Sequence, residues 1–162
     1  MAPGEYIHTG ELDIDKGVII QGDGTGEVIL KRSGQPDRVS KTSPSSSWYF
    51  PEQYGYSIRV TASDVSFKSV TIGGWESERT GFGWVLGVGG RNLTFEEVSF
   101  PGMNIRSAIV VYATVSGLKI SKCTFSGGYY EAAIRGGTTN MTVEETLFEE
   151  RHWYGGPIHF DD

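Results

Sequence analysis

The residues best suited to chemistry in this sequence are basic, acidic and aromatic side chains in its second half. Arg135, His159, Glu131 and Tyr130 supply a guanidinium group, an imidazole, a carboxylate and a phenol. A guanidinium group forks a carboxylate with two parallel hydrogen bonds. If the substrate is an acidic sugar, Arg135 neutralises its carboxylate, and His159 or Tyr130 removes the adjacent proton in a β-elimination. This set therefore predicts catalytic residues acting on an acidic glycan.

Two alternatives to this chemistry follow from the same residues. Glu131 with Asp161 would instead form an acid/base pair for glycoside hydrolysis, where the spacing of the carboxylates decides the stereochemical course. A purely structural interpretation pairs Arg135 with Glu131 or Glu149 across neighbouring strands, with little net gain in stability. The side chains expected to bind substrate through aromatic faces or a positive charge are Trp84, Tyr112, Tyr129, Trp153 and Arg106.

A repeated segment must position these residues. Residues 91–100, 116–125 and 139–148 share one pattern, in which Leu93, Leu118 and Met141 occupy equivalent positions. Residues 65–72 form a fourth copy. Repeats of this length that carry strand patterning are typical of a solenoid, in which each unit buries its apolar face against the next.

Each repeat contains three short strands. Apolar and polar residues alternate in the first two, which places the apolar members on one face. A third apolar run follows at 108–111, 132–134 and 157–160. Helical spacing of apolar residues does not recur, and the period drifts, unlike the strict hexapeptide rhythm of left-handed β-helices. We therefore predict an all-β, single-stranded right-handed parallel β-helix of about six turns, with three parallel sheets.

We expect one domain over residues 1–162. Residues 1–16 would form an N-terminal strand and cap, residues 31–54 a long loop, and residues 63–162 four regular turns. Cys123 is the single cysteine, so no intrachain disulfide can form. Its position matches Val98 in the preceding copy, which predicts a small core residue.

Composition excludes several classes of function. The net charge of −6 argues against a nucleic-acid partner, for which a basic stripe is expected. No run of 18 apolar residues is present, so we expect no membrane partner. No secretory leader follows Met1, and the cellular compartment stays open. We predict no metal site from the residues alone, because neither His8 nor His152 has a suitable partner nearby in sequence.

The opening segments 3–6 and 12–24, together with the repeats, resemble the pectin-lyase-like superfamily of right-handed parallel β-helices. This resemblance implies a ligand groove along the outer face of the third strands. The residues expected to point outward there are Trp84, Leu86, Val110, Tyr112, Arg135 and His159. Because successive strands lie about 4.8 Å apart, we expect Tyr112, Arg135 and His159 to form one ladder.

Residues 127–137 and 143–149 are similar to a segment of alginate and chondroitin lyases of polysaccharide lyase family 6. That likeness implies that Arg135 lies near the uronate and that Glu131 lies near a cluster of calcium-binding carboxylates. Calcium is thus the only cofactor we consider.

The leading hypothesis is binding, and potentially cleavage, of an acidic polysaccharide along the outer face of one sheet. The alternative is a non-catalytic structural, adhesin-like or tailspike-like module. Such a module would form a homo-oligomer through an open C-terminal end that contains Ile158 and Phe160.

Overall fold

The computed structural model describes residues 1–33, 56–75, 85–87, 89–105, 107–112, 114–129, 132–137, 139–152 and 156–159. Within these ranges every helix-or-strand element is a β-strand. The all-β prediction is therefore confirmed.

The strands form three sheets, here called A, B and C, in which all neighbours are parallel. Sheet A contains, in spatial order, β1 (Gly4–Thr9), β4 (Val28–Ser33), β7 (Thr71–Trp75), β10 (Ser99–Ile105), β13 (Thr124–Tyr129) and β16 (Leu147–His152). Sheet B contains β2 (Leu12–Ile14), β5 (Ile58–Val60), β8 (Val85–Gly87), β11 (Ile109–Val111), β14 (Ile134–Gly136) and β17 (Ile158–His159). Sheet C contains β3 (Ile19–Gln21), β6 (Val65–Lys68), β9 (Arg91–Glu96), β12 (Ser116–Ser121) and β15 (Thr139–Glu144).

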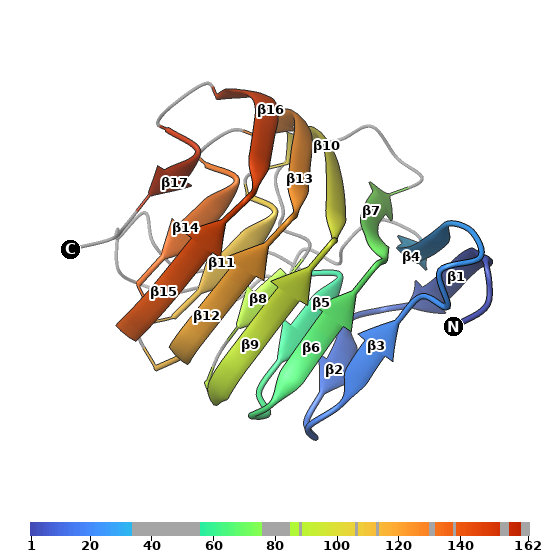
Figure 1. Cartoon of the computed structure of the whole chain (residues 1–162), viewed down its shortest axis with the longest axis horizontal. Helices are drawn as coiled ribbons and strands as arrows, with labels where there is room; N and C mark the ends of the chain where they lie inside the picture. The colour runs from blue at the N-terminus through green and yellow to red at the C-terminus, as the bar shows by residue number, and fades with distance from the viewer. Residues whose placement is uncertain are drawn as a thin grey trace, which may run out of the picture.

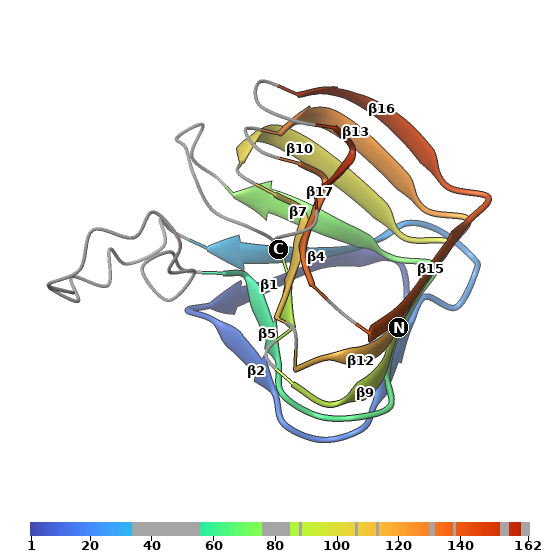
Figure 2. The same cartoon turned by 90° about the vertical axis from the view of Figure 1, so that its left-hand side faces the viewer.

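The chain visits the three sheets in a fixed order, so each strand pairs with the strand three elements earlier and three elements later. The result is a right-handed parallel β-solenoid, with β1–β3 at one end and β15–β17 at the other (Figure 1). Seen along its axis, the three sheets enclose the interior (Figure 2). The predicted six turns are slightly too many, since the solenoid has about four. The regular turns run from β6 to β17. The five earlier strands, β1 to β5, are interrupted between β4 and β5 by residues 34–55, which lie outside the described residues.

The corner between sheets C and A repeats one backbone geometry. Ser69, Glu97, Lys122 and Glu145 occupy equivalent positions there, with φ of 50°, 54°, 52° and 48°. A single left-handed residue turns the chain sharply, which is why two residues suffice between these strands.

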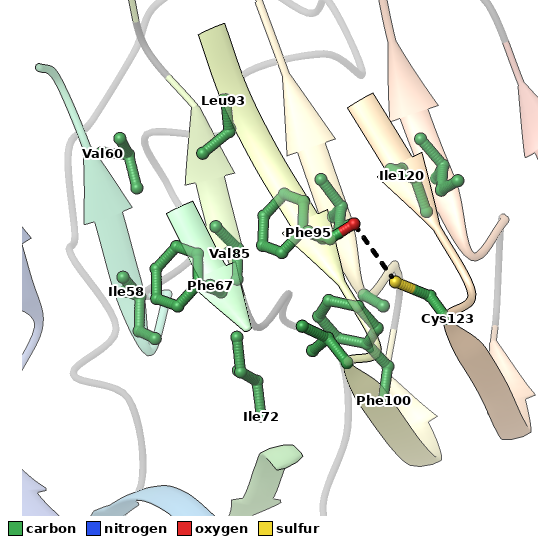
Figure 3. Close-up of a cluster of buried hydrophobic side chains, with 14 of the residues drawn as sticks. Ile58, Val60, Phe67, Ile72, Val85, Leu93, Phe95, Phe100, Ile120 and Cys123 are labelled. Carbon is green, nitrogen blue, oxygen red and sulfur yellow. Dashed lines mark hydrogen bonds between the residues drawn. The ribbon is translucent and has the colours of Figure 1, made fainter. Parts of the chain in front are cut away.

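The core lies between the inner faces of the three sheets. Phe67 and Phe95 from sheet C and Phe100 from sheet A are fully buried (Figure 3). Phe125 from sheet A is also fully buried. Cys123 is also buried, as predicted, and its thiol donates to the carbonyl oxygen of Phe95 at 3.6 Å (Figure 3). Burial raises the pKa of this thiol to about 11, so it is not an activated nucleophile.

The N-terminal part differs from the prediction in two details. Residues 1–16 contain two strands, β1 and β2. The expected loop over residues 31–54 begins too early, because β4 continues through Ser33 by pairing with β1. Residues 34–54 lie outside the described residues.

Candidate functional site: the outer face of sheet B

One row of side chains follows the outer face of sheet B across all six strands. Strand register aligns, in order, Asp13, Arg59, Leu86, Val110, Arg135 and His159, here called the outer row. The preceding residue of each strand from β5 to β14 is buried in the core, at Ile58, Val85, Ile109 and Ile134. Because side chains alternate along a strand, the side chains of Arg59, Val110 and Arg135 must point away from the core.

Arg135 and His159 are direct register partners on β14 and β17. The prediction that these two residues are neighbours on the outer face is therefore confirmed. Arg135 is half-buried and His159 is exposed. The Cα atoms of the two residues are thus one strand spacing, about 4.8 Å, apart.

The predicted ladder is wrong in its third member. The partner of Arg135 on β11 is Val110 and not Tyr112. Tyr112 follows β11, and its backbone amide donates to the carbonyl oxygen of Gly87 at 3.0 Å. The Tyr112 side chain is half-buried. It lies two residues beyond Val110, so it is displaced along the strand direction from the outer row.

The prediction for Tyr129 is also wrong. The sequence predicts that Tyr129 binds substrate through its aromatic face, but this residue ends β13 and is 0% exposed. Its hydroxyl donates to the carbonyl oxygen of Phe100 at 2.6 Å, which satisfies the polar end of a ring that packs in the core. Tyr129 is therefore a structural residue with no surface for a ligand.

The remaining predicted site residues lie outside the described residues. They are Glu131, Tyr130, Trp84, Trp153 and Arg106. In the described part of the chain no three His, Cys, Asp or Glu side chains gather in an arrangement that could hold a metal ion. Glu131, which the resemblance to lyases places near calcium-binding carboxylates, lies outside the described residues, so the calcium site stays a prediction.

Sequence reasoning missed Arg59 and Asp13, which extend the outer row toward the N-terminal end. The Arg59 Nη1 atom lies 4.0 Å from Asp13 Oδ1; the Asp13 side chain is largely exposed and the Arg59 side chain is partly exposed. An ion pair of this length on the surface contributes little to stability. The signal was present in the sequence, because Ile58-Arg59-Val60 has the same pattern as Ile134-Arg135-Gly136.

The fold and this row define a class: a right-handed parallel β-solenoid that carries two arginines and a histidine along the outside of one sheet. Comparison of the chain with protein-family models, with curated proteins and with solved structures found no match. The resemblance to the pectin-lyase-like superfamily therefore stays a prediction. Among the described residues, no helix has the length and apolar character needed to cross a membrane.

Proposed function

We propose that the protein binds an acidic linear glycan along the outer row of sheet B. The observation that carries this proposal is the alignment of Arg59 and Arg135 on one row, three strands apart. Their Cα atoms are thus about 14 Å apart. Between them the row contains Val110, whose apolar side chain suits contact with the C–H face of a sugar ring.

Charge supports an anionic ligand at this row. The chain carries a net charge of −6, so attraction to a polyanion has to come from a local arrangement of cations. Two arginines on one row can each fork a carboxylate of the same polymer chain. Since exposed charges are screened by salt, binding through this row is expected to weaken as ionic strength rises.

The Arg135–His159 pair also suits cleavage of a uronate by β-elimination. A carboxylate neutralised by Arg135 makes the proton on C5 more acidic, because the resulting carbanion is stabilised. His159, one strand away, would accept this proton as the C4–O bond breaks, a C4–C5 double bond forms and the departing oxygen takes a proton from water. Binding without cleavage would need the row but not the imidazole.

Calorimetric titration with polygalacturonate, alginate and chondroitin tests the binding proposal. We expect Arg135→Ala and Arg59→Ala each to weaken binding at least about tenfold, which corresponds to 1.4 kcal/mol. Arg91→Ala is the matched control, since Arg91 is an exposed arginine on sheet C. Absence of binding to all three polymers, or equal losses in the three variants, would refute the proposal. The ultraviolet band of the unsaturated product tests elimination separately, and His159→Ala should abolish this band while it preserves binding.

A second candidate function, self-assembly, rests on the C-terminal end of the solenoid. Residues of the last turn that face the core are only half-buried, namely Met141, Val143, Phe148 and Ile158. Their register partners one turn earlier, Leu118, Ile120, Phe125 and Ile134, are at most 1% exposed. The edges of β15, β16 and β17 also lack a second neighbouring strand among the described residues. We propose a second copy of the chain as the partner that covers this layer.

Sedimentation analysis over a range of protein concentrations tests the assembly. We expect association in the unchanged protein and its loss in Ile158→Lys, which places a charge in the proposed contact. Leu147→Lys is the control, because Leu147 is 51% exposed on the outer face of the same turn. A monomer at all concentrations would remove this candidate function and leave the glycan proposal untouched.

A further inference from the structure

A histidine and a serine from distant parts of the sequence meet near the N-terminal end of the solenoid. His8 lies on β1, and Ser57 directly precedes β5. The Ser57 Oγ atom is 3.2 Å from His8 Nε2, and His8 Nδ1 is 2.9 Å from the carbonyl oxygen of Gly10. His8 is half-buried, and Ser57 is 3% exposed. This pair lies on strands β1 and β5, away from the Arg135–His159 end of the outer row.

The hydrogen bonds determine which nitrogen of His8 carries the proton. The carbonyl oxygen of Gly10 can only accept, so Nδ1 must donate to it. In the neutral ring Nε2 is then an acceptor, and the Ser57 hydroxyl donates to it. Burial lowers the pKa of His8 below its usual 6.5, and the nearby charge of Arg32 lowers it further, against an opposing effect of the Gly10 hydrogen bond. The ring is therefore mainly neutral at pH 7, which is the state that a general base requires.

The backbone next to Ser57 is held from two sides. Arg32 Nη1 donates to the carbonyl oxygen of Tyr56 at 2.6 Å, and the Tyr56 amide donates to Glu11 Oε2 at 3.3 Å. The carbonyl oxygen of Ser57 itself accepts from the amide of Leu12 at 2.9 Å. Arg32 is also the register partner of His8 on the adjacent strand. A buried positive charge thus lies beside the peptide group that joins Tyr56 to Ser57.

We propose that Ser57 is a nucleophile, with His8 as its general base, in the hydrolysis of small carboxylic esters. The arrangement contains three elements of such a site: a hydroxyl, a base within hydrogen-bonding reach, and an acceptor that orients the base. The Arg32 guanidinium group supplies positive charge beside the peptide group that joins Tyr56 to Ser57. Because Ser57 is so little exposed, the acyl group has to be small, and acetyl esters are the substrate class that fits.

The reaction balances with water as the only co-reactant. Ser57 Oγ bonds to the ester carbonyl carbon while its proton passes to His8 Nε2. The C–O bond to the alcohol then breaks, and His8 returns the proton to the departing alcohol. Water next attacks the acylated serine with His8 as base, and release of the carboxylic acid regenerates the Ser57 hydroxyl.

Covalent labelling of the folded, unchanged protein is the test. It would be incubated with 4-nitrophenyl acetate, and modified peptides would be mapped by mass spectrometry. We expect a single adduct on Ser57, together with release of 4-nitrophenol. Ser57→Ala should lose both, and His8→Gln should slow acylation by about 100-fold or more, in line with the usual contribution of a general base. The acylation rate should rise with pH through the titration of His8 and then level off.

Ser107→Ala is the matched control. Ser107 is fully buried, and its Oγ atom has no hydrogen-bond partner within the described residues, so it has no base to activate it. If the His8–Ser57 bond only fastens β1 to β5, Ser57→Ala will lower the melting temperature while the native protein shows no adduct on Ser57. That result, labelling of other serines in place of Ser57, or 4-nitrophenol release that survives Ser57→Ala would overturn the proposal. Labelling of the unchanged protein stays decisive even if a variant does not fold.

Discussion

The rings of Phe100 and Phe125 stack on each other, with centroids 4.7 Å apart and planes 7° from parallel. They occupy register positions on β10 and β13, so their separation equals the spacing of the strands. Phe148 on β16 continues the stack with centroids 5.0 Å apart. A second stack, Phe67 on Phe95, lies on sheet C, and Phe95 meets Phe100 edge-to-face at 5.6 Å. The two stacks are therefore joined into one aromatic core.

Removal of a ring from the middle of this stack should cost much more stability than removal at its end. Phe125 is fully buried between two rings, whereas Phe148 is half-buried. We expect Phe125→Ala to lower the free energy of unfolding by about 3–5 kcal/mol, the usual cost of a large cavity. Phe148→Ala should cost clearly less, because water already reaches part of its site. Urea unfolding of both variants measures the difference, and equal losses would contradict the burial gradient along the stack.

A close approach of two strands requires glycine at position 136. A Cβ atom there would lie 1.8 Å from the carbonyl oxygen of Val111, and φ is 112°. Since the obstructing atom is backbone, Gly136→Ala cannot be accommodated by a side-chain rotation. We expect a loss of at least about 3 kcal/mol in the free energy of unfolding.

Gly128→Ala is the control for this prediction. Gly128 also lies in a strand, β13, but nothing surrounds its missing Cβ within 4 Å. Its change to alanine should leave the denaturant midpoint almost unchanged. A large loss of stability in Gly128→Ala with a small loss in Gly136→Ala would contradict the close approach of β14 to β11 at Gly136.

The repeated corner between sheets C and A predicts a stabilising substitution. Lys122 has φ of 52° and an exposed side chain. The left-handed conformation costs a non-glycine residue about 1–2 kcal/mol, while glycine loses about 0.5–1 kcal/mol more entropy on folding. We therefore expect Lys122→Gly to raise the free energy of unfolding by up to about 1 kcal/mol. Thermal unfolding provides the measurement.

Lys119→Gly is the control, and it should change the free energy of unfolding in the opposite direction. Lys119 lies inside β12 and its ammonium group is 2.7 Å from Glu144 Oε1. Glycine inside a strand loses side-chain packing and this ion pair, so stability should fall. Destabilisation by both changes would contradict the left-handed strain at Lys122.

The sequence repeats predicted the register of the solenoid because equivalent positions stack directly. Leu93, Leu118 and Met141 were aligned by the repeat, and they are register partners in sheet C. The same repeat pattern predicted that Ile109 and Ile134 face inward on sheet B, where they are buried register partners. Strands of four to six residues with clear alternation leave only one orientation that buries the apolar face.

Short strands and long-range contacts explain what the sequence did not reveal. The β11 strand has only three residues, so alternation alone could not distinguish Val110 from Tyr112 as the partner of Arg135. Two consecutive glycines, Gly127 and Gly128, weaken the strand pattern before Tyr129, yet pairing with β10 and β16 keeps the strand extended to Tyr129. The His8–Ser57 pair joins residues 49 positions apart, which no local pattern could indicate.

Acidification should weaken the N-terminal end of the solenoid through His8. Burial holds the folded-state pKa of His8 below 6.5, whereas the unfolded chain keeps the ordinary value. Between these two values the unfolded state binds more protons, so stability increases with pH in that window. The contribution of His8 is therefore fully present above pH 6.5 and is lost as the pH falls through the folded-state value.

Urea unfolding at several pH values from about 8 down to about 5 measures this effect. Groups that face His8 across the neighbouring strands are Arg32, which stays charged in this range, and the Ser57 hydroxyl. His8→Gln should flatten the dependence of the unfolding free energy on pH between pH 6.5 and pH 5. His159→Gln, which changes an exposed histidine on β17, should leave the slope in place. A pH dependence of the unfolding free energy that persists in His8→Gln and vanishes in His159→Gln would contradict the effect of burial on His8. The neutral base proposed for Ser57 would then lose its physical support.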